Sequence, residues 1–402
     1  MNYFNKLKSL YSRKWQASFI ILFSVTTIFL LCELKNHRFH MHDFHVYYTA
    51  ASRIVHGENI FRPAEDGFYH FKYSPTSAIF FIPFSFLPYD FAKVMYWLIL
   101  SVIICAGFYM SLTMLKPDFK QQKDHRHTNN FVLLSALVVS VHFFRELELG
   151  QVNHLLLVIY IGILFLFWKN QQKASGAVLA ASLFFKPFAL LFVPWFFLMK
   201  KWKLILFSVI STVVFALLPA VFDGLKALPS QYSSWFQEMF IELSHKQTLL
   251  TNENHTIFSI LARYTPLRFT SIVTNYAHLY QTVIMLLLCL TFIIMYRKRA
   301  SINAPFLLEG AFLINLIPLL SFTSHNAFGF VELSVMIILY YFKELSRPLK
   351  VTAIAGMILS GGNIYELVGK KLWFVFNNLS LVGIGALLLL AVLFFMRNKK
   401  IC

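Results

Sequence analysis

The sequence predicts an all-α polytopic membrane protein with about ten spanning helices. Hydrophobic residues make up 58% of its 402 residues, charged residues 13%, and mean hydropathy is +0.62. A soluble globular domain carries about 25% charged residues, so that class is excluded. The apolar residues form long runs at 17–32, 91–115, 131–144, 152–168, 174–199, 204–222, 270–296, 304–322, 328–342, 350–364 and 374–396.

Basic residues give the chain a net charge of +18, and they cluster in short loops between the apolar runs. Cytoplasmic loops of membrane proteins are enriched in Lys and Arg, so this distribution indicates topology rather than nucleic-acid binding. It predicts that both termini are cytoplasmic. The first apolar run is too long for a cleaved signal and no small-x-small site follows it, so we expect it to stay as a signal anchor.

One apolar run must enter and leave on the same side for all basic loops to share the cytoplasm. The segment 174–200 is the candidate, since Lys186-Pro187 interrupts it and proline breaks a helix. The short run 77–87 between two prolines reads as a half-helix. We therefore expect a single membrane domain over 1–402, with a broken re-entrant hairpin at 174–200 and two extracytoplasmic loops at 34–90 and 223–268.

An amphipathic helix is predicted in the first of these loops. Apolar residues recur with helical spacing from Phe44 to Val55, and Gly57 is suited to end the helix. We expect this helix to lie on the membrane surface. Asp43, at its start, has two interpretations: an N-cap that accepts backbone N–H bonds, or a catalytic base held at the membrane edge.

Lys186 is the most informative polar residue in the apolar runs. Inserting a lysine at membrane depth costs about 2.5–3.5 kcal/mol, so such a residue usually has a partner or a ligand. Beside a helix break, its ammonium and free backbone N–H groups could hold a phosphate. Alternatively, it reaches the interface or pairs with a carboxylate. Glu146 and Glu148, next to Arg145, are expected to form ion pairs with basic neighbours.

The remaining polar candidates are amides and histidines beside predicted helix ends. Gln151 and Asn153 suit sugar hydroxyls or helix caps. The run 251–256 suits a carbohydrate or a solvated loop, and His325 suits a phosphate as imidazolium or a backbone carbonyl as a neutral ring. Cysteine spacing indicates no disulfide framework. Nucleotide and metal motifs are absent from the sequence, so we expect no cofactor and no metal.

Several of these segments together resemble one known family. The segments are 43–51 (DFHVYYTAA), 57–61 (GENIF), 71–75 (FKYSP), 150–153 (GQVN), 176–187 ending in FKP, and 321–326 (SFTSHN). In this order they resemble glycosyltransferase family 87. The chain departs from that family's usual pattern in having Thr323-Ser324 before His325, where an aromatic residue is common.

The resemblance implies a GT-C fold and an inverting transfer of a sugar, usually mannose, from a polyprenyl-phosphate carrier. The acceptor would be a lipid or glycan on the outer side of the bacterial cytoplasmic membrane, and nucleic acid would not be a partner. Asp43 would be the catalytic base, and the donor phosphate would be bound by Lys186, His325 and Arg145. The expected substrate-binding residues are Tyr47, Tyr48, Tyr73, Gln151, Asn153, Asn252, Asn254, His255 and Asn326.

Two other classes of function stay open at this point. Broken helices and a buried lysine also mark substrate sites in transporters, so a transporter or flippase of a lipid-linked or anionic substrate is one alternative. A ligase that moves a whole lipid-linked glycan with His325 as its base is the other.

Overall fold

A computed structural model describes residues 11–244, 254–269, 276–297, 305–321 and 325–398. These ranges contain helices and turns and no β-strand, as the sequence predicts. The chain forms two compact units. One, here called the Asp43 unit, comprises residues 19–110 and 144–246, and the other, the C-terminal unit, comprises residues 1–18, 111–143 and 247–402.

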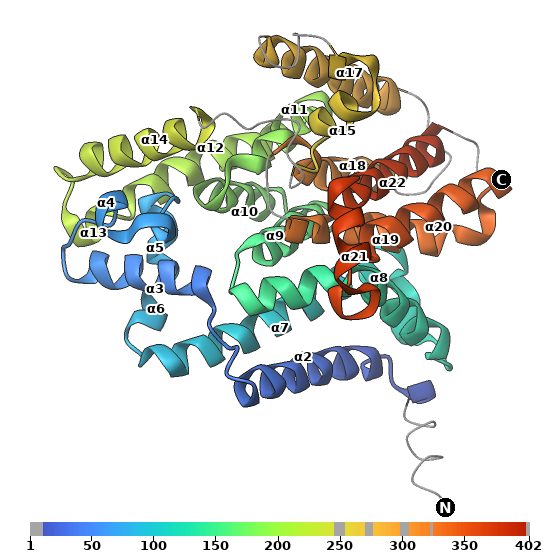
Figure 1. Ribbon diagram of the computed structural model, residues 1–402, viewed down its shortest axis with the longest axis horizontal. Coiled ribbons are helices and arrows are strands. Elements are labelled where there is room, and N and C mark those ends of the chain that lie inside the picture. The colour runs from blue at the N-terminus through green and yellow to red at the C-terminus, as the bar shows by residue number, and fades with distance from the viewer. Residues whose placement is uncertain (1–10, 245–253, 270–275, 298–304, 322–324, 399–402) are drawn as a thin grey trace, which may run out of the picture. The chain divides into compact units, whose positions relative to one another are not determined.

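The helices follow one another with short connections (Figure 1). The first group is α2 (Ala17–Lys35), α3 (His42–Val55), α4 (Pro63–Asp66), η1 (Gly67–Tyr69), α5 (Pro75–Ile79), α6 (Ile82–Ser85), α7 (Tyr89–Leu115), η2 (Pro117–Gln121), α8 (Arg126–Leu149), α9 (Asn153–Trp168), α10 (Gln172–Phe185), η3 (Pro187–Leu191), α11 (Phe192–Leu198), α12 (Trp202–Leu217), α13 (Ala220–Asp223) and α14 (Leu228–Ser244). The second group is α15 (Ile257–Tyr264), η4 (Pro266–Phe269), α17 (Ala277–Arg297), α18 (Pro305–Leu320), η5 (His325–Val331), α19 (Glu332–Tyr340), η6 (Phe342–Glu344), α20 (Arg347–Gly361), α21 (Tyr365–Asn378) and α22 (Leu381–Asn398).

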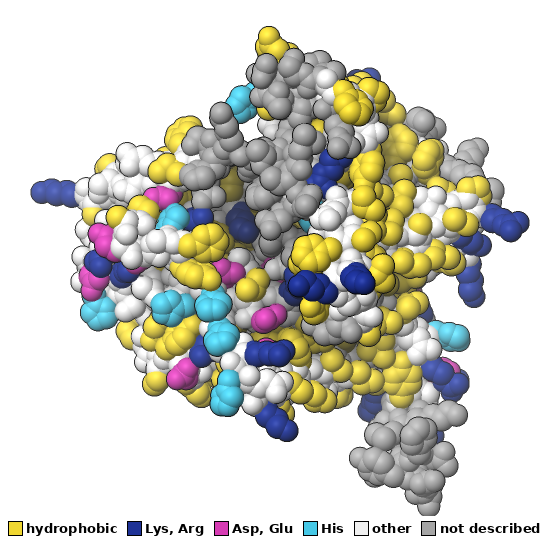
Figure 2. All heavy atoms as spheres, viewed as in Figure 1, with side chains coloured by type: hydrophobic (Ala, Val, Ile, Leu, Met, Phe, Trp, Pro, Cys, Tyr) yellow, Lys and Arg dark blue, Asp and Glu magenta, His cyan; other side chains and the backbone are white. Residues whose placement is uncertain are grey.

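Within the described ranges, five helical segments are long and apolar enough to cross a membrane. They are Ala17–Lys35, Tyr89–Leu115, Trp202–Asp223, Ala277–Arg297 and Leu381–Asn398. Shorter apolar helices accompany them, and apolar side chains cover much of the face seen in Figure 2. The chain is therefore an all-α polytopic membrane protein. The figure of about ten spans stays a prediction, since several apolar helices are shorter than a hydrocarbon core requires.

The first predicted loop is folded around α3. This helix lies beside α5 and α6 (Figure 1), with Phe44, Tyr47 and Ile54 buried on its inner face. Gly57, with φ +68°, follows its end, as the sequence predicts. The guanidinium of Arg53 donates two hydrogen bonds to the carboxylate of Asp66, so α4 is fastened to α3.

The predicted helix break at Lys186 is present. The helix α10 ends at Phe185, and Lys186 has extended backbone angles (φ −144°, ψ 132°) before Pro187. The first loop is attached at this break, because the backbone N–H and hydroxyl of Ser74 both donate to the carbonyl of Phe184, at 3.3 and 2.7 Å. Ser74 also caps α5 by accepting a bond from the N–H of Ser77.

The C-terminal unit is built around α18, α20 and α22. A buried ion pair joins two of these helices, with the guanidinium of Arg397 donating to Oε1 of Glu309 at 2.8 and 3.0 Å. Close packing of α20 against α22 depends on Gly385, where a side-chain Cβ would lie 2.4 Å from the backbone nitrogen of Ser360.

Candidate functional site

Asp43 is in the first turn of α3, one residue after its beginning. The N-cap of this helix is Met41, in the left-handed region (φ 49°, ψ 54°), and no side chain caps the helix. The N-cap interpretation of Asp43 is therefore wrong. Because the left-handed residue at 41 begins the helix one turn position earlier than expected, the Asp43 carboxylate is available for side-chain contacts instead.

The turn between α8 and α9 brings Gln151 and Asn153 to this carboxylate. The turn is a helix-ending motif in which the N–H groups of Gly150 and Gln151 donate to the carbonyl of Glu146, at 2.9 and 3.1 Å. Gly150 has φ +69°. A Cβ at this position would lie 2.7 Å from Cβ of Phe44, so only glycine lets α3 approach the turn this closely.

Gln151 connects Asp43 to two tyrosines. Its side-chain amide donates a hydrogen bond to the Asp43 carboxylate. Its carbonyl oxygen, Oε1, accepts a bond from the hydroxyl of Tyr47 at 3.3 Å, and the hydroxyls of Tyr47 and Tyr73 are 3.0 Å apart. Three predicted substrate-binding residues therefore join the predicted base in one hydrogen-bonded group.

Lys186 lies on the other side of Tyr73. Its Nζ is 5.9 Å from the centre of the Tyr73 ring and donates a hydrogen bond of 2.7 Å to Oδ1 of Asn153. Nδ2 of Asn153 in turn donates to Oε1 of Glu146 at 2.8 Å. Asn153 is the first residue of α9, but its side chain does not cap the helix. Its amide instead connects the lysine to a buried carboxylate.

The electrostatics of this group favour a proton acceptor at Asp43. Burial raises the pKa of the Asp43 carboxyl above its ordinary value, and the charge of Glu146 raises it further. The hydrogen bond from Gln151 and the charge of Lys186 act in the opposite direction. A carboxylate whose pKa is raised is a stronger base than an exposed aspartate, as general-base catalysis requires.

Two other predicted residues of the Asp43 unit have different surroundings. The hydroxyl of Tyr48 donates to the backbone carbonyl of Leu87 at 2.8 Å, which ties α3 to the end of the first loop. Arg145 is half-buried in α8, one residue before Glu146. Adjacent residues on a helix do not face each other, so the two side chains point in different directions.

The remaining predicted residues belong to the C-terminal unit. Asn254 accepts hydrogen bonds from the N–H and hydroxyl of Thr256, in a turn that begins α15. His255 is buried against Phe328, and burial lowers its pKa to about 4, so its ring is neutral at pH 7. Asn326 is buried in η5. Asn252 and the side chain of His325 lie outside the described part of the chain.

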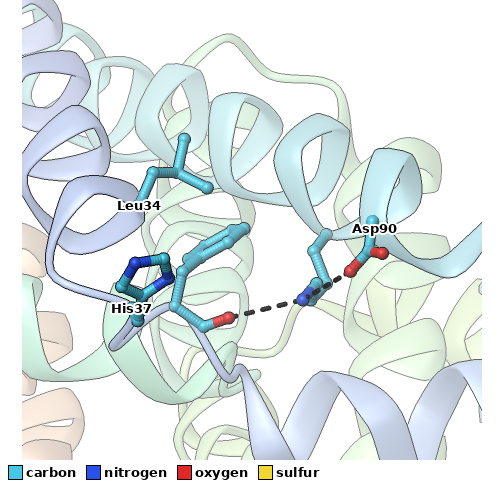
Figure 3. A pocket seen from close by; sticks show the side chains of 5 residues that line it. Leu34, His37 and Asp90 are labelled. Atoms are coloured by element: carbon cyan, nitrogen blue, oxygen red, sulfur yellow. Dashed lines mark hydrogen bonds and ion pairs between the residues drawn. The ribbon is translucent and has the colours of Figure 1, made fainter.

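A separate pocket of about 290 Å³ lies where α2 ends and α7 begins (Figure 3). It is lined by Leu34, His37, Phe39, Asp90 and Lys93. The Lys93 ammonium bonds to the carbonyl of Phe39 at 3.3 Å and to Oδ1 of Asp90 at 2.9 Å. These contacts use the cation to hold the α2–α3 connection against α7, and they involve none of the residues predicted for the site.

Glu146 is the member of the site that sequence reasoning missed. The expected ion pair with basic neighbours is incorrect as a description of its main contact, because its Oε1 bonds to an amide inside the protein. Oε2 of Glu146 is 3.8 Å from Nδ1 of His154, which is also buried. The available signal was its position before a glycine turn, which folds residue 146 back onto residue 153.

Comparison with known families gave one match. The model of glycosyltransferase family 87 matches residues 71–323, well over half of the chain. This range contains Tyr73, Glu146, Gln151, Asn153 and Lys186, and it begins after Asp43. No curated protein and no solved structure gave a significant match.

Proposed function

Since the chain belongs to glycosyltransferase family 87, and is thus a membrane glycosyltransferase, we propose that it uses a polyprenyl-phosphate-linked sugar. The sugar is mannose, and the acceptor is a lipid or glycan on the extracytoplasmic face of the bacterial cytoplasmic membrane. The arrangement of Asp43 and Lys186 carries this proposal. A carboxylate and an ammonium, each held by a side-chain amide, are joined through the Tyr47–Tyr73 pair.

Each of these groups has one role in the proposed reaction. The Asp43 carboxylate takes the proton of an acceptor hydroxyl while that oxygen forms a bond to the anomeric carbon. The bond from the anomeric carbon to the phosphate oxygen breaks on the opposite face, through an oxocarbenium-like state, so the configuration inverts. The phosphate leaves with the bonding electron pair, and Lys186 stabilises its negative charge.

Membership of a glycosyltransferase family favours this reaction over the transporter and flippase alternatives. The hydrogen bond from Gln151 supports the assignment of Asp43 as base, because it fixes one carboxylate orientation. Asp43 and Lys186 both belong to segments of one compact unit, so the role of either does not depend on the C-terminal unit.

A donor comparison tests the proposal. Purified protein is supplied with radiolabelled mannose, either as polyprenyl-phosphate-mannose or as nucleotide-activated mannose, together with lipid extract from the native membrane. We expect labelled product from the lipid-linked donor alone. Labelled product from the nucleotide-activated donor alone would contradict the proposed donor class. Transfer of a different sugar from a polyprenyl-phosphate carrier would contradict the choice of mannose only.

A further inference from the structure

Glu146 and Asn153 are both buried, with 1% and 3% of their surfaces exposed. Burying a carboxylate is costly unless it is hydrogen-bonded, so a single well-formed bond at such a site is a strong constraint. Here that bond is the one from Nδ2 of Asn153 to Oε1 of Glu146, at 2.8 Å.

The direction of this bond decides how Asn153 presents itself to Lys186. A carboxylate only accepts hydrogen bonds, and an ammonium only donates them. The amide between them must therefore turn its NH₂ group toward Glu146 and its oxygen toward Lys186, as it does at 2.7 Å. Were the amide reversed, its NH₂ group would meet the ammonium and its oxygen would meet the carboxylate.

The Lys186 ammonium has further donors available. An ammonium carries three N–H groups, and Asn153 accepts from one of them. Among the residues that the structure describes, no second acceptor bonds to Nζ and no carboxylate forms an ion pair with it. Lys186 is also only half-buried, so its two other N–H groups can reach a bound molecule.

We propose that Glu146 is a positioning residue that acts through the Asn153 amide to aim the Lys186 ammonium at the lipid-linked phosphate. This rests on the proposed role of Lys186 in binding phosphate. Glu146 touches neither substrate nor the reacting atoms. It fixes the orientation of one amide, which fixes the direction of one N–H bond of the lysine and leaves the others for the phosphate oxygens.

The test exchanges the two groups. In Glu146→Gln the new amide can present either an oxygen or an NH₂ group, so the orientation of Asn153 is no longer determined. The double variant Glu146→Gln, Asn153→Asp restores both bonds. The glutamine NH₂ donates to the new aspartate, and that aspartate accepts from Lys186. This double variant keeps nearly the same volume and the same net charge as the wild type.

The readout is binding of a polyprenyl monophosphate compared with the polyprenol of the same chain length, by the purified full-length protein. The wild type should prefer the phosphate. Glu146→Gln should lose about tenfold of this preference, the cost of misdirecting a hydrogen bond to a charged group, with little change in polyprenol binding. The double variant should recover the preference to within about threefold of wild type. Glu148→Gln, an exposed residue of the same helix, is the matched control.

Each outcome has a distinct meaning. An unchanged preference in Glu146→Gln overturns the inference and leaves the proposed function intact, as does a double variant no better than Glu146→Gln. A merely structural Glu146 predicts lower stability in the single variant without recovery of phosphate preference in the exchange. Equal binding of phosphate and alcohol by the wild type would contradict the proposed role of Lys186 itself, and with it this inference.

Discussion

Gly150 and Phe44 touch so closely that a Cβ on Gly150 would lie 2.7 Å from Cβ of Phe44. Phe44 follows Asp43 on α3, and Gly150 precedes Gln151 on the turn after α8. The contact between these two backbones therefore determines whether the Gln151 amide can reach the Asp43 carboxylate.

Gly150→Ala should therefore reduce sugar transfer by about tenfold or more. The added methyl group pushes α3 from the turn, and a change of about 1 Å near a reacting group can cost about 10²-fold. Gly57→Ala is the control, since Gly57 has nearly the same φ (+68°) but no atom within 4 Å of its Cβ position. Both variants carry similar backbone strain, so equal activities in the two would show that the contact with Phe44 has no catalytic effect.

The raised pKa of Asp43 predicts how both activity and stability depend on pH. Burial disfavours the charged carboxylate in the folded state, so Asp43 favours folding below its unfolded pKa, and this contribution is lost as pH rises through the folded pKa. Asp43→Asn should then melt at a higher temperature than wild type at pH 7. The two melting temperatures should converge at acid pH. Thermal unfolding in detergent across this pH range measures the difference.

The acid limb of the pH–rate profile should reflect the same group. Asp43 must be ionised to accept a proton, so kcat/KM should fall as pH decreases through its pKa, at a higher pH than for an ordinary aspartate. An acid limb at or below the ordinary aspartate pKa would be inconsistent with Asp43 as a buried base.

The Arg53–Asp66 pair should stabilise the first loop. Asp66→Asn should cost about 1.5–3 kcal/mol, the usual value of hydrogen bonds to charged groups. The bond from Arg53 holds the pKa of Asp66 below its usual range, so the contribution is present above the unfolded pKa and is lost as pH falls through the folded pKa. Glu58→Gln, which removes a more exposed pair with Arg62, should change the unfolding free energy little. Similar losses in both variants would argue against this anchoring role.

Lys186 should matter for catalysis more than for folding. Lys186→Ala removes the cation proposed to stabilise the leaving phosphate, and should lower kcat/KM by about 10²–10³-fold. Lys173, near the start of the same helix, lies over the ring of Phe207 and is the control for loss of one positive charge. Steady-state kinetics with purified enzyme would compare the two. A Lys186→Ala variant as active as Lys173→Ala would rule out the proposed role.

Several features of the fold follow from local sequence. Pro187 fixes the break after α10 because it cannot continue the helical hydrogen bonding, and Gly57 ends α3 because glycine readily adopts a positive φ. The apolar spacing after Asp43 predicts the buried face of α3, with Phe44, Tyr47 and Ile54 buried as expected.

Other features depend on tertiary contacts that local patterns do not encode. Met41 rather than Asp43 caps α3, through a left-handed residue type that is uncommon there. Tyr48 shares the apolar spacing of Tyr47, yet its hydroxyl bonds to Leu87 and that of Tyr47 bonds to Gln151. The role of Glu146 could not be inferred from an expected ion pair, because its partner is the amide of Asn153, across the Gly150 turn.

The measurement that tests the central claim most directly is mannose transfer from polyprenyl-phosphate-mannose by wild type and by Asp43→Asn. The control is Asp90→Asn, which changes a carboxylate in the same region whose side chain is 93% exposed. We expect transfer by the wild type and by Asp90→Asn, and loss of transfer in a folded Asp43→Asn protein. Substantial transfer by Asp43→Asn would contradict the account, because an amide cannot accept the acceptor's proton.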